Sequence, residues 1–375
     1  MKKTLAALAV LGAFAGSAMA ADVTLYGAVD TGFEYKHTKT TGDKAVDTFD
    51  MQTGWDTPSR WGLKGSEDLG NGYKVSFKLE SGFSSDDGTM NQSDRLFGRE
   101  AGLTLSGPFG SVAFGRFGGI SSSAGTYDML GYVESFDGGD GDVWGFASSS
   151  RYDNMVVYQT PRFAGLQLTA QYSFKTDSKQ SKEDYSGDEG TSDAQRYASV
   201  GLSGEYGPAS FAVGYELTKY GSSAATSTTP AARQLDKDGQ LVFLGGNYDF
   251  EVVQLFAEAQ YFKHQTALNT NKWGEATAFG KDALGLKGYG LHLGAAAPLV
   301  GGTLTGGLYY VDYSEEFDAK ADQDFKFYGV SARYNYPLSE RTGVYAGAGY
   351  GQTKADDSGD KAQITQVYCG LVHTF

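Results

Sequence analysis

Cysteine is nearly missing from this chain: Cys369 is the single cysteine, so no disulfide bond can form within the molecule. Proline is also scarce, with 7 residues among 375, whereas glycine numbers 53, tyrosine 25 and phenylalanine 23. This composition is typical of many strands joined by tight turns rather than of helices. Hydrogen bonds between strands must therefore hold the fold together.

A long apolar run is missing as well. The longest apolar stretch, residues 5–14, is too short to cross a membrane as a helix. It follows Lys2 and Lys3 and precedes small residues that end at Ala20, which are the three parts of a secretory signal. We expect residues 1–20 to be a signal peptide and residues 21–375 to form the mature domain. A membrane-spanning role in that domain would fall to strands.

Positive charge is outweighed by negative charge. The chain has 31 Lys and Arg against 45 Asp and Glu, a formal net charge of −14, which argues against binding nucleic acid. The four histidines are scattered without the spacing of a zinc site. A nucleophile elbow and a P-loop are both missing. We therefore predict no enzymatic activity, no catalytic residue, no metal and no cofactor.

Alternation of apolar and polar residues is the main pattern that is present. Val23, Leu25 and Val29 alternate with Thr24 and Asp30, and the same period of two recurs in residues 73–83, 166–174 and 253–261. Successive side chains of a strand point to opposite faces, so each segment has one apolar and one polar face. Strands of this length with this pattern are typical of a barrel in which one face meets lipid and the other water.

The connections between these segments alternate between short and long. Seven short segments rich in turn-forming residues are residues 70–72, 107–110, 162–165, 207–208, 249–251, 300–302 and 337–340. Between them lie eight polar segments, residues 36–54, 84–95, 118–150, 175–193, 218–238, 264–285, 314–324 and 352–362. This spacing predicts an all-β fold, a 16-stranded antiparallel transmembrane β-barrel. The last strand would end at Phe375.

Four segments resemble a known family. They are VTLYG from Val23, SRWGLKGSEDLGNG from Ser59, LSGPFGSVAFGR ending at Arg116, and the closing GLVHTF. Together they are similar to the trimeric general porins of Gram-negative bacteria, most closely the β-proteobacterial subtype, over residues 21–375. The resemblance implies a cell outer-membrane homotrimer with a water-filled channel for ions and small hydrophilic solutes. It also implies contact with outer-membrane lipid and lipopolysaccharide, and an export signal at Phe375 for the barrel insertion machinery.

The resemblance further implies that the third outer loop folds inward and faces basic residues across the pore. Acidic residues of that constriction would be Glu134, Asp137, Asp140 and Asp142, and basic ones would be Arg60, Arg99 and Arg151. Alternation supports an inward position for Arg60 and Arg151, with Tyr152 pointing away, but gives no support for Arg99. The acidic loop leads us to expect a weak cation preference. Calcium binding or simple solvation are the alternatives for residues 137–142, which lack EF-hand spacing.

Two other functions compete with general diffusion. One is a substrate-selective outer-membrane channel, whose conductance would saturate with one sugar or acid, and the other is an adhesin or structural barrel. The early strands also carry small or polar residues that we expect on the outer face, at a subunit contact: Gly27, Gly65, Glu67, Glu100 and Gly102.

Overall fold

A computed structural model describes residues 23–136, 143–180, 187–222, 234–270, 272–277 and 282–375. The predicted signal peptide, residues 1–20, lies outside these ranges. The described strands are β1 (Thr24–Thr40), β2 (Val46–Thr53), β3 (Arg60–Gly70), β4 (Tyr73–Gly82), β5 (Glu100–Gly107), β6 (Gly110–Gly118), β7 (Arg151–Gln159), β8 (Leu166–Ser173), β9 (Arg196–Tyr206), β10 (Ala209–Lys219), β11 (Gly239–Asp249), β12 (Gln254–Gln265), β13 (Ala283–Leu299), β14 (Gly302–Phe317), β15 (Gln323–Pro337), β16 (Thr342–Ala355) and β17 (Lys361–Thr374). Two short turns, α2 (Asn91–Asp94) and η1 (Leu130–Tyr132), lie between strands.

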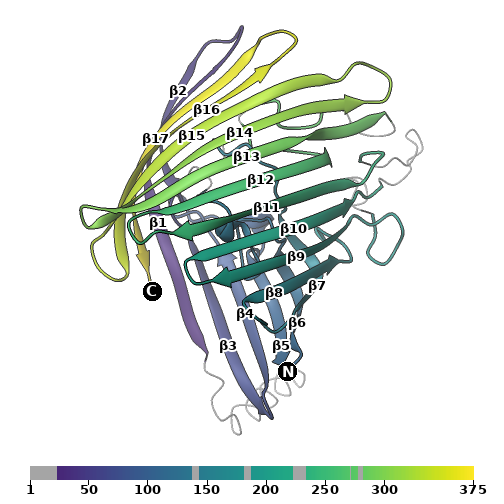
Figure 1. Cartoon of the computed structure of the whole chain (residues 1–375), viewed down its shortest axis with the longest axis vertical. Coiled ribbons are helices and arrows are strands. Elements are labelled where there is room, and N and C mark those ends of the chain that lie inside the picture. The colour runs from purple at the N-terminus through teal and green to yellow at the C-terminus, as the bar shows by residue number, and fades with distance from the viewer. Residues whose placement is uncertain (1–22, 137–142, 181–186, 223–233, 271, 278–281) are drawn as a thin grey trace, which may run out of the picture.

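The strands close into a single antiparallel barrel (Figure 1). From β3 onward each strand pairs with the next one along the chain, and β17 returns to pair with β1 from Ala28↔Thr374 to Thr40↔Ala362. The backbones of Gly27 and Phe375 exchange two hydrogen bonds of 3.0 Å at the seam. Closure leaves no free edge along this seam, which is what a membrane-spanning sheet requires.

The second barrel strand is interrupted. β2 pairs with the upper part of β1, from Thr31↔Thr53 to Thr38↔Val46, and β3 pairs with its lower part, from Thr24↔Lys64 to Ala28↔Arg60. Residues 54–59 between them leave the sheet. β2 and β3 together thus fill one position, and the barrel has sixteen strands, as the sequence predicts.

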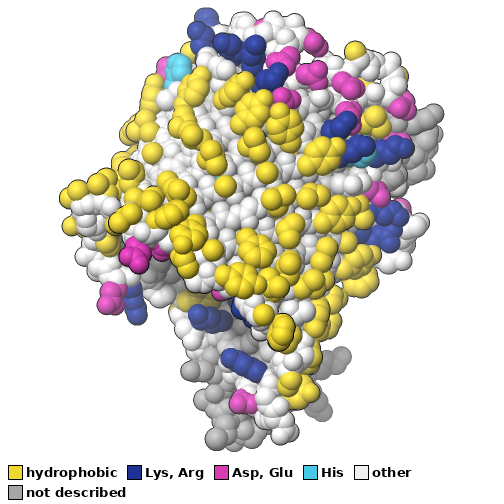
Figure 2. Space-filling view, viewed as in Figure 1, with side chains coloured by type: hydrophobic (Ala, Val, Ile, Leu, Met, Phe, Trp, Pro, Cys, Tyr) yellow, Lys and Arg dark blue, Asp and Glu magenta, His cyan; other side chains and the backbone are white. Residues whose placement is uncertain are grey.

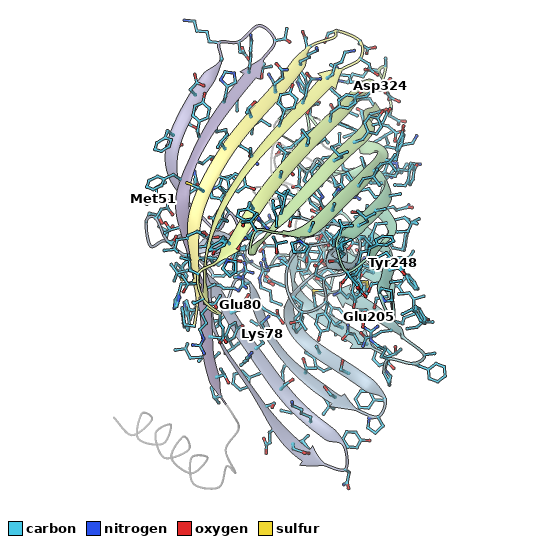
Figure 3. All side chains as sticks on the ribbon, turned by 60° about the vertical axis from the view of Figure 1, so that its left-hand side comes forward. Met51, Lys78, Glu80, Glu205, Tyr248 and Asp324 are labelled. Atoms are coloured by element: carbon cyan, nitrogen blue, oxygen red, sulfur yellow. The ribbon has the colours of Figure 1, made fainter. Side chains whose placement is uncertain are left out.

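The two faces of the wall follow the predicted alternation. In β1, Leu25 and Phe33 are 59% and 45% exposed, whereas Asp30 and Glu34 are 0% and 3% exposed. Apolar side chains cover the middle of the outer wall, and charged ones gather toward its upper end in Figure 2. Met51, labelled in Figure 3, projects from the outer side. An apolar exterior with a polar interior is the arrangement of a barrel in lipid.

All seven predicted short turns join consecutive strands in the structure. At the first of them Asn71 has a φ of 55°, in the left-handed region that Asn and Gly tolerate best. The long connections are less well predicted, because three strand pairs extend into segments expected to be loops. The first expected loop, residues 36–54, is largely a hairpin of β1 and β2, and the last two shrink to 318–322 and 356–360.

The largest buried cluster lies between the connection of β6 to β7 and the wall. Ile120, Leu130, Val133 and Phe146 of that connection pack against inner residues of β10 to β15 such as Phe243. Other wall residues in the cluster are Ala212, Leu241, Phe262, Leu286, Tyr309, Val311, Tyr313, Phe325 and Phe327. These wall positions lie on the face opposite the exposed apolar residues. The described part of this connection therefore packs against buried residues of β10 to β15.

Candidate functional site

Two of the three predicted arginines meet at one carboxylate on the inner wall. Arg99 Nε donates to Glu80 Oε1 at 2.7 Å, and Arg60 Nε lies 3.9 Å from Glu80 Oε2. Tyr26 OH donates to the same carboxylate at 2.8 Å. Glu80 follows the polar parity of β4 and is 4% exposed, and Arg99 reaches it from the residue just before β5. The pair is thus held on one side of the interior.

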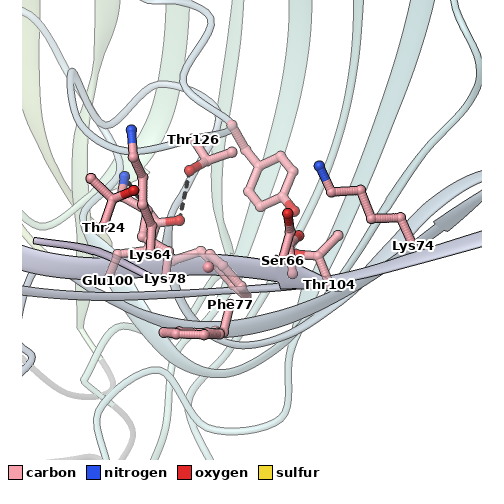
Figure 4. A pocket seen from close by; sticks show the side chains of 14 residues that line it. Thr24, Lys64, Ser66, Lys74, Phe77, Lys78, Glu100, Thr104 and Thr126 are labelled. Atoms are coloured by element: carbon pink, nitrogen blue, oxygen red, sulfur yellow. Dashed lines mark hydrogen bonds and ion pairs between the residues drawn. The ribbon is translucent and has the colours of Figure 1, made fainter. Parts of the chain in front are cut away.

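Lysines extend this charged wall. Lys78 Nζ donates to Glu100 Oε2 at 2.8 Å, and Thr126 Oγ1 donates to Glu100 Oε1 at 2.6 Å (Figure 4). These residues line a cavity of about 420 Å³, together with Lys64 and Lys74. Figure 3 shows Lys78 and Glu80 on the inner side of the bend in the wall. The wall formed by β3, β4 and β5 therefore presents fixed positive charge to the interior.

Glu100 and Gly102 correct an expectation about the outer face. Glu100 bonds to Lys78 inside the barrel, and a Cβ on Gly102 would lie 2.1 Å from the buried ring of Phe117. Leu103 and Leu105, at 51% and 37% exposed, take the outer face of β5 instead. Because sides alternate along a strand, exposed leucines at odd positions place the even positions inside.

Arg151 lies in electrostatic range of Arg99 and Glu80. The alternation argument for its position is wrong in one respect, because Tyr152, expected on the outer face, packs against the interior Tyr197 with ring centroids 4.4 Å apart. The ladder of β6 and β7 shifts register here, and Asn154 has a φ of 52°. An extra residue in one strand breaks strict alternation locally, so parity read across it fails.

Glu134 lies at the other side of the interior. It is 7% exposed, and its backbone N–H donates to the carbonyl of Leu130, the first residue of η1, at 2.9 Å. The next residue, Ser135, donates through its Oγ to Gly306 O on β14 at 2.9 Å. The neighbours of Glu134 thus contact strands far around the wall from β3 to β5. Asp137, Asp140 and Asp142 lie outside the described residues.

Both ends of the β6 to β7 connection are fastened to one buried carboxylate. Glu216 Oε1 on β10 accepts hydrogen bonds from Ser121 N–H at 3.0 Å and from Ser149 Oγ at 3.0 Å. Tyr197 OH donates to the same oxygen at 2.7 Å. We call this group the neck of the connection. A buried carboxyl oxygen that accepts three hydrogen bonds is well satisfied, so the neck is a firm attachment.

A further acid in this connection is buried. Asp128 Oδ1 accepts a hydrogen bond from Leu130 N–H at 3.1 Å. Burial raises the pKa of Asp128 to about 6, although nearby backbone N–H groups act in the opposite direction. The carboxylate of Glu258 on β12 lies in electrostatic range. Asp128 is thus a buried acid of this connection whose pKa is raised.

Several charged residues of the polar face were not among the predicted constriction residues. Glu80, Lys78 and Lys74 lie on the polar parity of β4, which was a sufficient signal to include them. Arg333 on β15, by contrast, contacts residues 55 and 56, and no pattern in the sequence indicates that these residues meet.

Within the described part of the chain, no group of three or more His, Cys, Asp or Glu side chains is arranged to hold a metal ion. No helix there is long and apolar enough to cross a membrane.

Comparison with known proteins gives consistent matches over nearly the whole chain. The family model described as Gram-negative porin matches residues 6–357. An outer membrane porin protein of Bordetella pertussis is 35% identical, covering 100% of both chains. Outer membrane porin protein 32 of Delftia acidovorans is 33% identical, covering 99% of this chain and 95% of its own. Among solved structures, an anion-selective porin from Comamonas acidovorans superposes with a TM-score of 0.65 at 26% identity, covering 95% of this chain and 100% of that one.

Proposed function

Because this chain belongs to the Gram-negative porin family and so forms a non-enzymatic outer-membrane channel for ions and small solutes, we propose that it is a general diffusion porin with a charged constriction. The connection of β6 to β7, the third long one, folds into the barrel and narrows the water-filled path. Solutes cross by electrodiffusion, without a covalent step. We call this connection, residues 119–150, loop 3.

The observation that carries this proposal is the packing of loop 3 against the inner wall. Ile120, Leu130 and Val133 are at most 1% exposed, and their neighbours are inner residues of β10 to β15. The neck at Glu216 attaches both ends of the loop to the wall. A loop that buries apolar side chains inside a barrel reduces the open cross-section there, which supports a constriction at this level.

The charges support a transverse field across the constriction. Arg60 of β3 and Arg99, just before β5, meet at Glu80, and Arg151 of β7 lies in electrostatic range of Arg99 and Glu80, with Glu134 of loop 3 beyond. Charges in a narrow, low-dielectric passage act more strongly than charges on an open surface. Such a field orients dipolar solutes and disfavours apolar ones.

The described charges favour anions rather than the cations expected from the acidic loop. Lys64 and Lys74 are exposed to the interior, whereas Glu134 is 7% exposed. The similar porin of Comamonas acidovorans is described as anion-selective. We therefore expect weak anion preference in this chain, set by the accessible lysines and arginines.

The test is single-channel recording in a planar bilayer with a tenfold salt gradient. Neutralising the base in R60S should move the reversal potential toward cations, and neutralising the acid in E134Q should move it toward anions. Both shifts should shrink in concentrated salt because screening shortens the range of charge. The control R341S changes an exposed arginine in a short turn and should shift nothing. Shifts of equal sign from R60S and E134Q, or none from either, would overturn the constriction.

Assembly and export form a second part of the proposal. The hairpin of β1 and β2 exposes Phe33, Tyr35, Phe49 and Met51 on its outer side, at 45%, 41%, 69% and 50%. This apolar surface supports a homotrimer contact, and the rest of the apolar wall would meet outer-membrane lipid and lipopolysaccharide. Residues 1–20 would direct export and be cleaved, and Phe375 would be recognised by the barrel insertion machinery.

A further inference from the structure

Residues 54–59 form a short segment on the inside of the barrel, which we call the inner strap. It begins at Gly54, whose φ of +80° turns the chain out of the sheet. Trp55 is 6% exposed, and its ring stacks on Tyr368 of β17 with centroids 4.9 Å apart and planes 15° apart. A tryptophan buried in this way holds the strap against the wall.

Asp30 attaches the strap to β1. Its Oδ2 accepts hydrogen bonds from the N–H groups of Asp56 at 2.9 Å and Thr57 at 2.8 Å. Its Oδ1 accepts from Tyr345 OH at 2.5 Å, and its backbone N–H donates to Ser59 Oγ at 2.9 Å. Asp30 is fully buried, so these bonds are shielded from water and strong.

Arg333 attaches the strap to β15. Its Nη1 donates to Trp55 O at 3.0 Å, and its Nη2 lies 3.3 Å from Asp56 Oδ1. Asn335 Nδ2 donates to the same Oδ1 at 2.5 Å. β16 and β17 lie between β15 and β1 in the sheet, as Figure 1 shows, so the strap bridges across the inner face of two strands.

The same guanidinium contacts loop 3. Arg333 Cζ lies 5.0 Å from the centre of the Phe136 ring, a cation–π contact. Phe136 O accepts a hydrogen bond from Tyr309 OH at 2.6 Å. Phe136 stands two residues after Glu134 and is the last described residue before the acidic run. One side chain therefore touches both the strap and loop 3.

The strap also contacts the basic side of the constriction. Arg60 follows it directly and donates through Nη1 to Pro58 O at 3.2 Å. Arg60 is one of the two arginines that meet at Glu80. The chain of contacts thus runs from Phe136 through Arg333 and the strap to Arg60. It joins the acidic and basic sides along the wall.

We propose that Arg333 is a positioning residue that fixes loop 3 and the inner strap relative to each other, so that the open channel keeps a single width. This inference rests on the constriction by loop 3 proposed above. A planar guanidinium can donate to a carbonyl and a carboxylate at one end while its face covers an aromatic ring. A lysine ammonium keeps the charge but cannot make all three contacts.

The test compares R333K with R333A in single-channel recordings of the assembled channel. For both variants we expect the variance of the open-channel current to rise by at least about twofold, because loop 3 gains alternative positions. For R333K the reversal potential should stay at the wild-type value, since the charge is kept. The control R341K makes the same exchange in a short turn and should change neither quantity.

A double-mutant comparison identifies the path. F136A should raise the variance of the open-channel current as R333A does. The double variant R333A/F136A should show little more variance than either single variant, because both substitutions remove the same contact between Arg333 and Phe136. Wild-type variance in R333K, or additive effects in the double variant, would overturn the inference. If R333A fails to assemble, R333K and F136A still decide the question. Normal variance in R333K with opposite shifts in R60S and E134Q would refute the positioning role and leave the constriction standing.

Discussion

At the scale of single residues, Asp128 makes the packing of loop 3 dependent on pH. Burial raises its pKa to about 6 in the folded protein, above the value near 3.8 of a free carboxyl. An acid whose folded pKa is raised stabilises the fold fully below the unfolded pKa, and this contribution is lost as pH rises through the folded pKa. Loop 3 should therefore pack less stably at pH 7 than at pH 4, by up to about 3 kcal/mol.

Hydrogen exchange of residues 119–136, corrected for intrinsic rates, measures this effect. Protection should fall between pH 4 and pH 7 in the wild-type protein. In D128N, whose side chain does not titrate, protection should be nearly independent of pH over that window. An equal pH dependence in wild type and D128N would assign the effect to another group, such as Glu258, which lies in electrostatic range of Asp128.

Glu216 is a second residue whose substitution should affect loop 3, because it attaches both ends of that loop to the wall. In E216A the buried donors of Tyr197, Ser121 and Ser149 lose their shared acceptor, at about 1–3 kcal/mol for each unsatisfied group. Loop 3 should then be cleaved faster by added protease, within residues 119–150. The control E216Q keeps one acceptor oxygen and should be cleaved at an intermediate rate. Cleavage of E216A at the wild-type rate would show that the neck does not hold the loop.

At the scale of elements, the end of the closing strand β17 can be tested by truncation. Deleting Phe375 removes the two backbone hydrogen bonds to Gly27 that end the seam, together with the proposed export signal. We expect most of the truncated chain to remain in the periplasm, measured by fractionation and surface labelling. F375Y retains an aromatic terminus and the backbone bonds and should assemble normally. Full surface assembly of the truncated chain would remove the proposed role of Phe375.

Strand lengths were the element-scale property that the sequence predicted least well. Polar residues 36–40 of β1 pair with β17, and residues 36–38 pair also with β2, although their composition is typical of a loop. Antiparallel pairing needs only backbone groups, so a polar hairpin can extend a barrel strand beyond the apolar band. The turns were predicted well because their residues determine the backbone conformation locally.

At the scale of the whole molecule, the apolar outer side of the β1–β2 hairpin is the surface that we propose for the homotrimer contact. Unheated detergent extract should migrate as a trimer on a gel and collapse to a monomer on boiling. The double variant F49K/M51K places two charges on the proposed contact and should migrate as a monomer without heating. V300K, at an exposed short turn, is the matched control and should remain a trimer. A wild-type monomer by light scattering in mild detergent would refute the contact.

The sequence by itself determined the barrel and most of its faces. Period-two alternation assigns each side chain to one face from its own strand alone, so Leu25 could be placed outward and Asp30 inward without knowing any partner. Turn residues determined where strands end, and alternating connection lengths determined their number. Arg60 was placed inside by the same rule. These are local properties, and local sequence is sufficient for them.

Only the tertiary structure decided which inner residues meet. Glu80 joins Arg60 and Arg99, and Asp56 joins Arg333, because barrel closure and the departure of residues 54–59 from the sheet bring distant segments together. Parity gives a face but not a neighbour across the interior, and a bulge such as the one near Asn154 reverses it without a signal in residue type. Contacts of this kind depend on the register of many strand pairs at once, and so they arise only from the folded barrel.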